Sequence, residues 1–294
     1  MLRVERLGKS YGDRAALSEV TFDVRPGEMF GFVGANGAGK TTTMRIIMGV
    51  LAADAGRVTW RGAELTRTRR RAFGYMPEER GLYQKMKVAE QIEYFGRQYG
   101  LSAAASRRAT GEWIERLGLT ERRDDQVQAL SLGNQQRTQL AVALVHDPEV
   151  LVLDEPFSGL DPIGVDALAD VLAEKRDAGV PVVFSSHQLD LVERLSDAVG
   201  IIKAGRMVAA GTVDEVRARE GRRLLRVGLR DAAPGWAERL PGTVVGTPSR
   251  GHALVEPNGH DDQDILSAAL KEGRLEHFGW ELPTLSEIFR EVVA

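Results

Sequence analysis

The chain has 294 residues, of which 43% are hydrophobic and 28% are charged, and its formal net charge is −3. This composition is ordinary for a globular protein with one large and one small domain, and the absence of a basic excess argues against nucleic-acid binding. The chain contains no cysteine, which excludes disulfides and thiol chemistry, and it has no run of about 18 apolar residues that could span a bilayer.

Alternating apolar and polar residues predict half-buried strands near the beginning of the chain. We expect an antiparallel sheet from the segments Leu2–Leu7, Leu17–Val24, Arg57–Trp60 and Ala72–Met76. Tyr11 lies between the first two segments, where an aromatic ring could stack on an adenine base, although a lone tyrosine there is more often a turn residue. The densest basic run, Arg69 to Arg71, is expected to be a solvated edge.

The stretch from Gly34 to Thr42 fits the phosphate-loop pattern G-x-x-x-x-G-K-[ST]. A short apolar strand is predicted before it and an amphipathic helix after it, which is the context that the pattern requires. Its glycines allow backbone N–H groups to approach an anion, and the helix adds the positive end of its dipole. We expect Lys40 to reach the β- and γ-phosphates and Thr41 to bind Mg²⁺. The predicted nucleotide-binding residues of the loop are Gly34, Asn36, Gly37, Ala38, Gly39, Lys40, Thr41 and Thr42.

Residues 79–146 are predicted to form a mostly helical insertion. Val88–Tyr99 and Ala103–Leu117 are long segments without proline, and each is followed by a glycine that can end a helix. Ser131 can cap the next helix, which begins in the sequence Leu-Ser-Leu-Gly-Asn-Gln-Gln-Arg from Leu130 to Arg137. The residues alone leave a structural cap and a phosphate-binding role equally open.

The run Val150–Leu153 predicts a parallel strand that is buried on both faces, and two carboxylates follow it. Ligands of open α/β sheets bind at the carboxyl ends of such strands. Asp154 is therefore predicted to hold Mg²⁺ and Glu155 to act as a base toward an attacking water. His187 follows a second buried strand, Pro181–Ser185, and could contact the γ-phosphate from the same edge.

A hairpin around Lys203–Gly205 is predicted to close the first domain, and the segment near Gly221–Arg223 is the predicted linker. Beyond it, the order of predicted elements is β-α-β-β-α-β, which suggests a small ferredoxin-like domain. No catalytic constellation occurs there, so regulation, dimerisation and partner docking all stay open. The predicted domains are residues 1–220 and 221–294.

These motifs, in this order and spacing over about residues 2–218, resemble the nucleotide-binding subunit of ABC transporters. Gly34–Thr42 is similar to the Walker A motif, Val150–Glu155 to Walker B, Leu130–Gln135 to the signature motif and Ser158–Asp161 to the D-loop. Under this resemblance His187 corresponds to the switch histidine and Tyr11 to the adenine-stacking aromatic. The fold implied is a P-loop α/β ATPase domain with a mixed sheet core, an antiparallel β subdomain and a helical insertion, followed by the small α+β domain.

Three motifs depart from the usual family pattern. The signature loop has Leu132 and Asn134 where glycine and glutamine are usual, while Ser131 and Gly133 remain. Glu78 replaces the usual glutamine of the Q-loop, and a carboxylate cannot donate as an amide can. Gly159 replaces an alanine of the D-loop. The Pro77–Tyr83 variant, the signature variant and the C-terminal domain resemble the sodium-efflux and antibiotic-efflux branch of export ATPases.

The resemblance implies ATP and Mg²⁺ as cofactors, with Mg²⁺ held by Thr41, Asp154 and Glu78. It implies a head-to-tail dimer in which Ser131, Gly133 and Asn134 of one copy complete the ATP site of the other. It also implies a separate membrane permease that keeps the protein at the cytoplasmic face of the cell membrane. A soluble ATPase that is not coupled to transport, an importer ATPase and a non-catalytic regulator remain alternatives.

Overall fold

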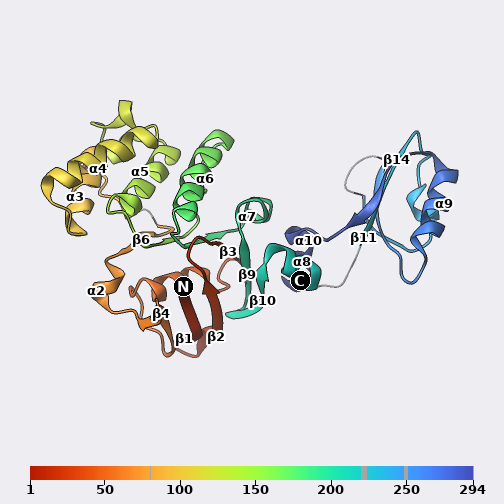
Figure 1. Ribbon diagram of the computed structural model, residues 1–294, viewed down its shortest axis with the longest axis horizontal. Coiled ribbons are helices and arrows are strands. Elements are labelled where there is room, and N and C mark those ends of the chain that lie inside the picture. Colours follow the sequence, from red (N-terminus) through yellow and green to blue (C-terminus); the bar gives the residue numbers. More distant parts are fainter. Residues whose placement is uncertain (80, 220–223, 248–250, 294) are drawn as a thin grey trace. The chain divides into compact units, whose positions relative to one another are not determined.

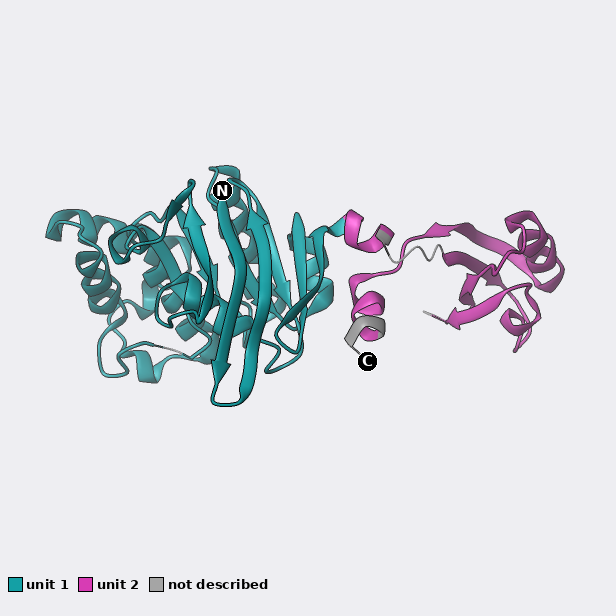
Figure 2. Ribbon diagram, turned by 90° about the horizontal axis from the view of Figure 1, so that it is seen from below, with its two compact units in different colours: residues 1–213, 293 teal, residues 214–292, 294 magenta. Residues whose placement is uncertain are grey.

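The structure is a computed structural model that describes residues 1–79, 81–219, 224–247 and 251–293 (Figure 1). The predicted linker near Gly221–Arg223 and Arg80 of the Q-loop variant lie outside the described residues. The chain divides into two compact units (Figure 2). The first comprises residues 1–213 together with residue 293, and the second comprises residues 214–292. These are called unit 1 and unit 2 below.

A six-stranded sheet forms the centre of unit 1, in the order β10-β9-β3-β8-β7-β6. Its strands are β3 (Met29–Val33), β6 (Phe73–Met76), β7 (Val150–Leu153), β8 (Val182–Ser186), β9 (Ala198–Lys203) and β10 (Arg206–Thr212). All pairs are parallel except the β9–β10 hairpin. Every residue of β3, β7 and β8 is buried, as strands covered on both faces require.

A four-stranded antiparallel sheet packs against this centre, in the order β2-β1-β4-β5. Its strands are β1 (Leu2–Tyr11), β2 (Arg14–Val24), β4 (Ala55–Trp60) and β5 (Ala63–Glu64). The two sheets share a core in which the rings of Phe22 and Phe30 stack at 4.7 Å. The prediction that Ala72–Met76 joins this antiparallel sheet is wrong, because β6 pairs in parallel with β7. Phe73, Gly74 and Met76 are buried, which suits the central sheet better than a half-exposed one.

The helices of unit 1 surround the central sheet, and α3, α4 and α5 gather into the predicted helical insertion (Figure 1). The helices are α1 (Lys40–Ile47), α2 (Arg67–Arg70), α3 (Val88–Gln98), α4 (Ala103–Arg116), α5 (Leu132–Leu144), α6 (Pro162–Asp177) and α7 (Leu189–Leu195), with 3₁₀ turns η1 (Thr120–Arg122) and η2 (Val127–Ala129). Several begin at side-chain caps: Ser102 accepts from Ala105 N in α4, and Asp161 accepts from Gly164 N in α6. None of the described helices is both long enough and apolar enough to cross a membrane.

Arg70 corrects the expectation of a solvated basic run. Its guanidinium donates to the carbonyl oxygens of Ile47 at 2.8 Å and Leu65 at 2.6 Å, so it satisfies the carboxyl end of α1. Burial lowers the pKa of this guanidinium. Arg69 and Arg71 are exposed, as expected.

Unit 2 contains an antiparallel sheet in the order β12-β13-β11-β14, which is the strand order of a ferredoxin-like fold. Its elements are α8 (Val213–Arg219), β11 (Leu224–Arg230), η3 (Ala237–Arg239), β12 (Thr243–Gly246), β13 (His252–Glu256), α9 (Asp262–Glu272), β14 (Arg274–Glu281) and α10 (Leu285–Val293). α9 covers one face through the buried side chains of Ile265 and Ala269. The first predicted helix is reduced to the 3₁₀ turn η3, and the predicted fold class is confirmed.

Candidate functional site

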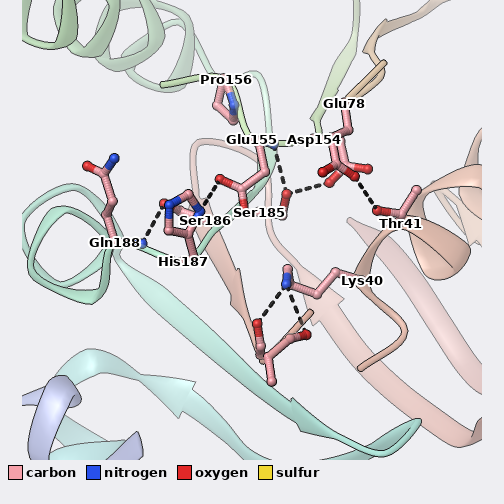
Figure 3. A network of polar contacts seen from close by, with 12 residues as sticks. Lys40, Thr41, Glu78, Asp154, Glu155, Pro156, Ser185, Ser186, His187 and Gln188 are labelled. Atoms are coloured by element: carbon pink, nitrogen blue, oxygen red, sulfur yellow. Dashed lines mark hydrogen bonds and ion pairs between the residues drawn. The ribbon is translucent and has the colours of Figure 1, made fainter. Parts of the chain in front are cut away.

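The candidate site lies where the parallel strands of unit 1 end together. Val33 of β3 is in register with Ser186 of β8, and Leu153 of β7 is in register with Phe184. The phosphate-loop pattern, the two carboxylates after β7 and the histidine after β8 therefore emerge at one edge of the sheet. Figure 3 shows Lys40, Glu155 and His187 gathered there. The register explains how segments more than 100 residues apart in sequence form one site.

The glycines of the loop are required by close packing. A side chain at Gly34 would place its Cβ 2.5 Å from Ile202 O, and one at Gly39 would meet Leu17 Cδ2 at 2.6 Å. Gly39 also has φ +116°, which favours glycine, and α1 begins directly after it. The loop therefore leads directly into α1, and the amino end of a helix is a site where backbone N–H groups can bind an anion.

Lys40 is buried, with 6% of its surface exposed. Its Nζ donates to Gly34 O at 2.6 Å and to Ala35 O at 3.4 Å, so the loop carbonyls solvate the charge (Figure 3). A buried cation is costly without such partners. A phosphate entering the loop would be a stronger partner for the same ammonium group.

A cavity of about 180 Å³ opens above the loop. It is lined by Ala16, Asn36, Gly37, Gly39, Lys40, Thr41, Thr42, Glu78, Asp154 and Glu155. The structure thus brings together most of the predicted loop residues and three predicted carboxylates. Other predicted residues do not line it: Tyr11, Gly34, Ala38, His187 and the signature residues.

Asp154 is almost fully buried, with 1% of its surface exposed. Ser185 Oγ donates to its Oδ1 at 2.5 Å, whereas its buried Oδ2 accepts no hydrogen bond from any residue that the structure describes. Thr41 Oγ1 donates to Glu78 Oε2 at 3.4 Å on the same cavity. A free carboxylate oxygen, a hydroxyl and a second carboxylate are hard oxygen donors of the kind that Mg²⁺ prefers, so these residues fit the ion.

Tyr75, on β6, reports the environment next to Asp154. Burial raises the pKa of its phenol, and the nearby negative charge of Asp154 raises it further.

Glu155 and His187 face each other across the ends of β7 and β8. His187 Nδ1 lies 2.9 Å from Glu155 Oε2, and the glutamate side chain is 13% exposed while the histidine side chain is 60% exposed (Figure 3). Glu155 has φ +52°, an uncommon conformation for a residue other than glycine. Such geometry directs the carboxylate into the cavity and must be held by neighbouring groups.

Tyr11 and the signature residues lie elsewhere in unit 1. Tyr11 ends β1, is 53% exposed, and has Lys9 Nζ 6.0 Å from its ring centre. Ser131 caps α5 by accepting from Asn134 N at 3.3 Å, which confirms the predicted cap. Its neighbour Leu132 is 56% exposed. Ser131 and Leu132 are therefore exposed at the start of α5, whereas Gly133 and Asn134 are half-buried.

Sequence reasoning missed four residues at this site. Ser185, Gln136 and Gln139 hydrogen-bond the carboxylate-bearing segments, and Ala16 lines the cavity. Ser185 could have been identified, because it is a polar residue near the end of a predicted buried strand and a buried hydroxyl needs a hydrogen-bond partner. No comparable signal identified the others.

Comparisons with known proteins agree with this geometry. A family model described as ABC transporter matches residues 17–158, and one described as the C-terminal domain of DrrA1-3-like ATP-binding proteins matches residues 211–293. The chain is 35% identical to the uncharacterised ABC transporter ATP-binding protein YhaQ of Bacillus subtilis (strain 168), over 100% of this chain and 98% of that protein. It is 33% identical to the daunorubicin resistance ATP-binding protein DrrA3 of Streptomyces coeruleorubidus, over 98% and 94% of the two chains. A solved ATP-binding subunit of an ABC transporter superposes with a TM-score of 0.70 at 33% identity, covering 75% of this chain and 93% of that one.

Proposed function

The chain belongs to the ATP-binding proteins of ABC transporters, and from this premise we propose that it hydrolyses ATP to power export through a separate membrane permease. The observation that carries the proposal is the convergence of Lys40, Asp154, Glu155 and His187 at the carboxyl edge of one parallel sheet. The intact lysine and carboxylates speak against a non-catalytic regulator.

ATP would bind with its phosphates in the loop from Gly34 to Thr42. The loop N–H groups and the amino end of α1 would contact the phosphate oxygens, and Lys40 would exchange its bonds to Gly34 O and Ala35 O for bonds to the β- and γ-phosphates. Tyr11 is exposed and would stack on the adenine.

Thr41, Asp154 and Glu78 are the residues that would hold Mg²⁺. Asp154 supplies the buried Oδ2, and the contact between Thr41 Oγ1 and Glu78 Oε2 keeps the other two oxygens on the same cavity. When bound with ATP, Mg²⁺ neutralises part of the charge on the β- and γ-phosphates.

Glu155 would take a proton from the water that attacks the γ-phosphorus. Its position on the cavity wall, largely shielded from solvent, suits a general base. His187, 2.9 Å from that carboxylate, would donate to a γ-phosphate oxygen and align it with the water. The bond from the γ-phosphorus to the bridging oxygen breaks as the water oxygen adds, giving ADP and phosphate.

The complete site would require two copies of the chain. Ser131, Gly133 and Asn134 do not line the cavity of their own copy, and they lie at the start of α5, where Ser131 is exposed and the other two are half-buried. A second copy placed head to tail would present these residues to the γ-phosphate. ATP would then favour the dimer because it contacts both copies, and hydrolysis would remove those contacts.

Export is supported by the similarity to a daunorubicin resistance protein along nearly the whole chain, including unit 2. The permease would dock near the helical insertion and the Glu78 loop, and this docking would hold the protein at the cytoplasmic face of the membrane. Unit 2 would act in regulation, dimerisation or partner docking, and the proposed domain boundary near residue 220 separates it from the ATPase domain. The proposal includes no nucleic-acid partner.

A two-part experiment tests the function. Purified protein with ATP and Mg²⁺ should release phosphate, and tagged protein extracted from membranes should bring down an integral-membrane partner. Absence of phosphate release would overturn the ATPase proposal. Phosphate release by a protein that recovers no membrane partner would favour a soluble ATPase instead, and a recovered partner that takes up its substrate would indicate an importer.

A further inference from the structure

α5 carries buried glutamines that reach toward the two carboxylate-bearing segments of the site. Gln136 and Gln139 are 5% and 3% exposed, and they lie three residues apart, so they share one face of the helix. Each side chain donates to the backbone of a different segment.

Gln136 holds the turn that follows β7. Its Nε2 donates to Glu155 O at 3.0 Å and to Pro156 O at 2.8 Å. Both partners are carbonyl oxygens, so the amide nitrogen must face them, and its two hydrogens are both used. Gln136 is thereby bound to the backbone of the residue that bears the proposed base.

Glu155 needs such support because of its backbone conformation. A residue other than glycine at φ +52° persists only when its surroundings hold it there. Ser185 Oγ accepts from Glu155 N at 2.9 Å, and Gln136 binds the carbonyl on the other side. The peptide groups on both sides of the Glu155 side chain are therefore fixed by β8 and by α5.

Gln139 holds the segment that bears Glu78. Its Nε2 donates to Pro77 O at 2.5 Å, directly before Glu78. α5 also lies in close backbone approach to β6, since a Cβ on Gly74 would clash with Ala143 O. The strand, the proline carbonyl and the helix therefore form one packed unit.

We propose that Gln136 and Gln139 are positioning residues that fix the Glu155 turn and the Glu78 segment to α5, the helix whose first turn is the signature motif. This inference rests on the proposed function. Ser131 caps the same helix, about 8 Å from Gln136 along the axis at 1.5 Å per residue. A displacement of α5 would therefore displace both carboxylates together.

The first test compares turnover with nucleotide affinity. Gln136→Leu and the same-sized Gln136→Glu both remove the donor, and each should lower kcat about 10–100-fold while the Kd for ATP stays within about twofold. Ser106→Ala is the control, because the buried Ser106 Oγ donates to Glu93 O at 2.7 Å between α3 and α4. It loses a comparable bond and should keep kcat. A kcat within twofold of the wild type for both Gln136 variants would overturn the proposal.

The second test places Gln136→Leu in a Glu155→Gln background. If Gln136 acts through Glu155, the double variant should hydrolyse ATP within about twofold of Glu155→Gln alone. A full multiplicative loss would overturn the positioning role. Normal turnover in Glu155→Gln itself would instead refute the proposed base, so the two failures can be told apart.

The third test addresses Gln139 without measuring turnover. In the Glu155→Gln protein with ATP, Mn²⁺ binding can be followed by its EPR signal, and Gln139→Leu should raise the Mn²⁺ dissociation constant about 3–10-fold. Ser106→Ala should leave it unchanged. An unchanged constant in Gln139→Leu would overturn the role assigned to Gln139.

Discussion

The two units differ in where they keep their charged groups. In unit 1, Lys40 and Asp154 are 6% and 1% exposed, and they face one cavity. In unit 2, the ion pairs Arg230–Glu276 and Arg239–Glu272 lie at the surface. Burying a charge is costly, so a protein keeps such groups where chemistry needs them, whereas exposed pairs contribute little. The proposed chemistry therefore rests on unit 1, where both buried groups line the same cavity.

The two units also differ in the directions of their strands. The parallel strands of unit 1 deliver four chain segments to one edge. The sheet of unit 2 is antiparallel throughout, and its core lies on the α9 face. The carboxyl ends of several strands thus meet at one edge in the first sheet, whereas neighbouring strands of the second sheet run in opposite directions.

The largest expected effect in unit 1 is that of Glu155→Gln. Removing the proposed base should slow phosphate release roughly 10²–10⁴-fold while ATP binding persists. Glu115→Gln is the matched control, since Glu115 is exposed on α4 and its loss should leave the rate unchanged. Turnover at the wild-type rate in Glu155→Gln would remove the base from the mechanism.

Acid should destabilise unit 1 through His146, a buried group outside the cavity. Its ring stacks on Tyr99 at 3.7 Å, and burial lowers its pKa from 6.5 to about 4. The unfolded chain binds the proton first, so stability is lost as the pH falls from 6.5 toward 4, by roughly 2–3 kcal/mol at about pH 4.5. Urea unfolding at about pH 6.5 and about pH 4.5 measures this difference in the free energy of unfolding.

His146→Phe sharpens that test, because phenylalanine keeps a ring against Tyr99 and cannot titrate. Its stability should depend less on pH in this window than the wild type's does. An identical pH dependence in the two proteins would show that other groups cause the loss. Burial of an ionisable group is thus no proof of catalysis, and Lys40 differs from His146 in lining the cavity at the carboxyl edge of the central sheet.

Lys40→Ala should weaken ATP binding roughly 10–100-fold, the usual loss for charge-assisted bonds. Fluorescent-nucleotide titration gives the constant. Lys271→Ala is the control in unit 2, where Lys271 is exposed on α9. Equal affinities in the two variants would contradict the binding role of the loop lysine.

Arg239→Ala should have the smallest effect. Its guanidinium bonds Glu272 at the surface of unit 2, so both the thermal midpoint and phosphate release should match the wild type. A clear loss of phosphate release would break the comparison, because it would give the surface of unit 2 a part in hydrolysis.

Most of the fold was predicted from local sequence patterns. The loop from Gly34 to Thr42 and the run Val150–Leu153 depend on residue types at fixed spacing, and both elements form as expected. The prediction for β6 was wrong because a short strand of four mostly apolar residues fits either sheet, and only its pairing with β7 decides between them.

The supporting bonds of the site could not be predicted. Gln136 and Gln139 bind backbone carbonyls 19 to 62 residues away. Every residue has a backbone carbonyl, so the sequence does not indicate which of them a side chain binds. Arg70 likewise donates to two backbone carbonyls, and nothing in the basic run distinguishes it from an arginine that is solvated by water. The groups proposed to react could therefore be predicted from the sequence, and the tertiary structure was needed to find the residues that hold them.

The central claim, that each ATP is shared by two copies, is tested most directly by sedimentation of Ser131→Arg. In a Glu155→Gln background with ATP, the parent protein should dimerise, and Ser131→Arg should stay monomeric with unchanged nucleotide affinity. Ser102→Arg is the matched control, because Ser102 caps α4 as Ser131 caps α5, so it should still dimerise. A normal ATP-dependent dimer of Ser131→Arg would contradict the shared site.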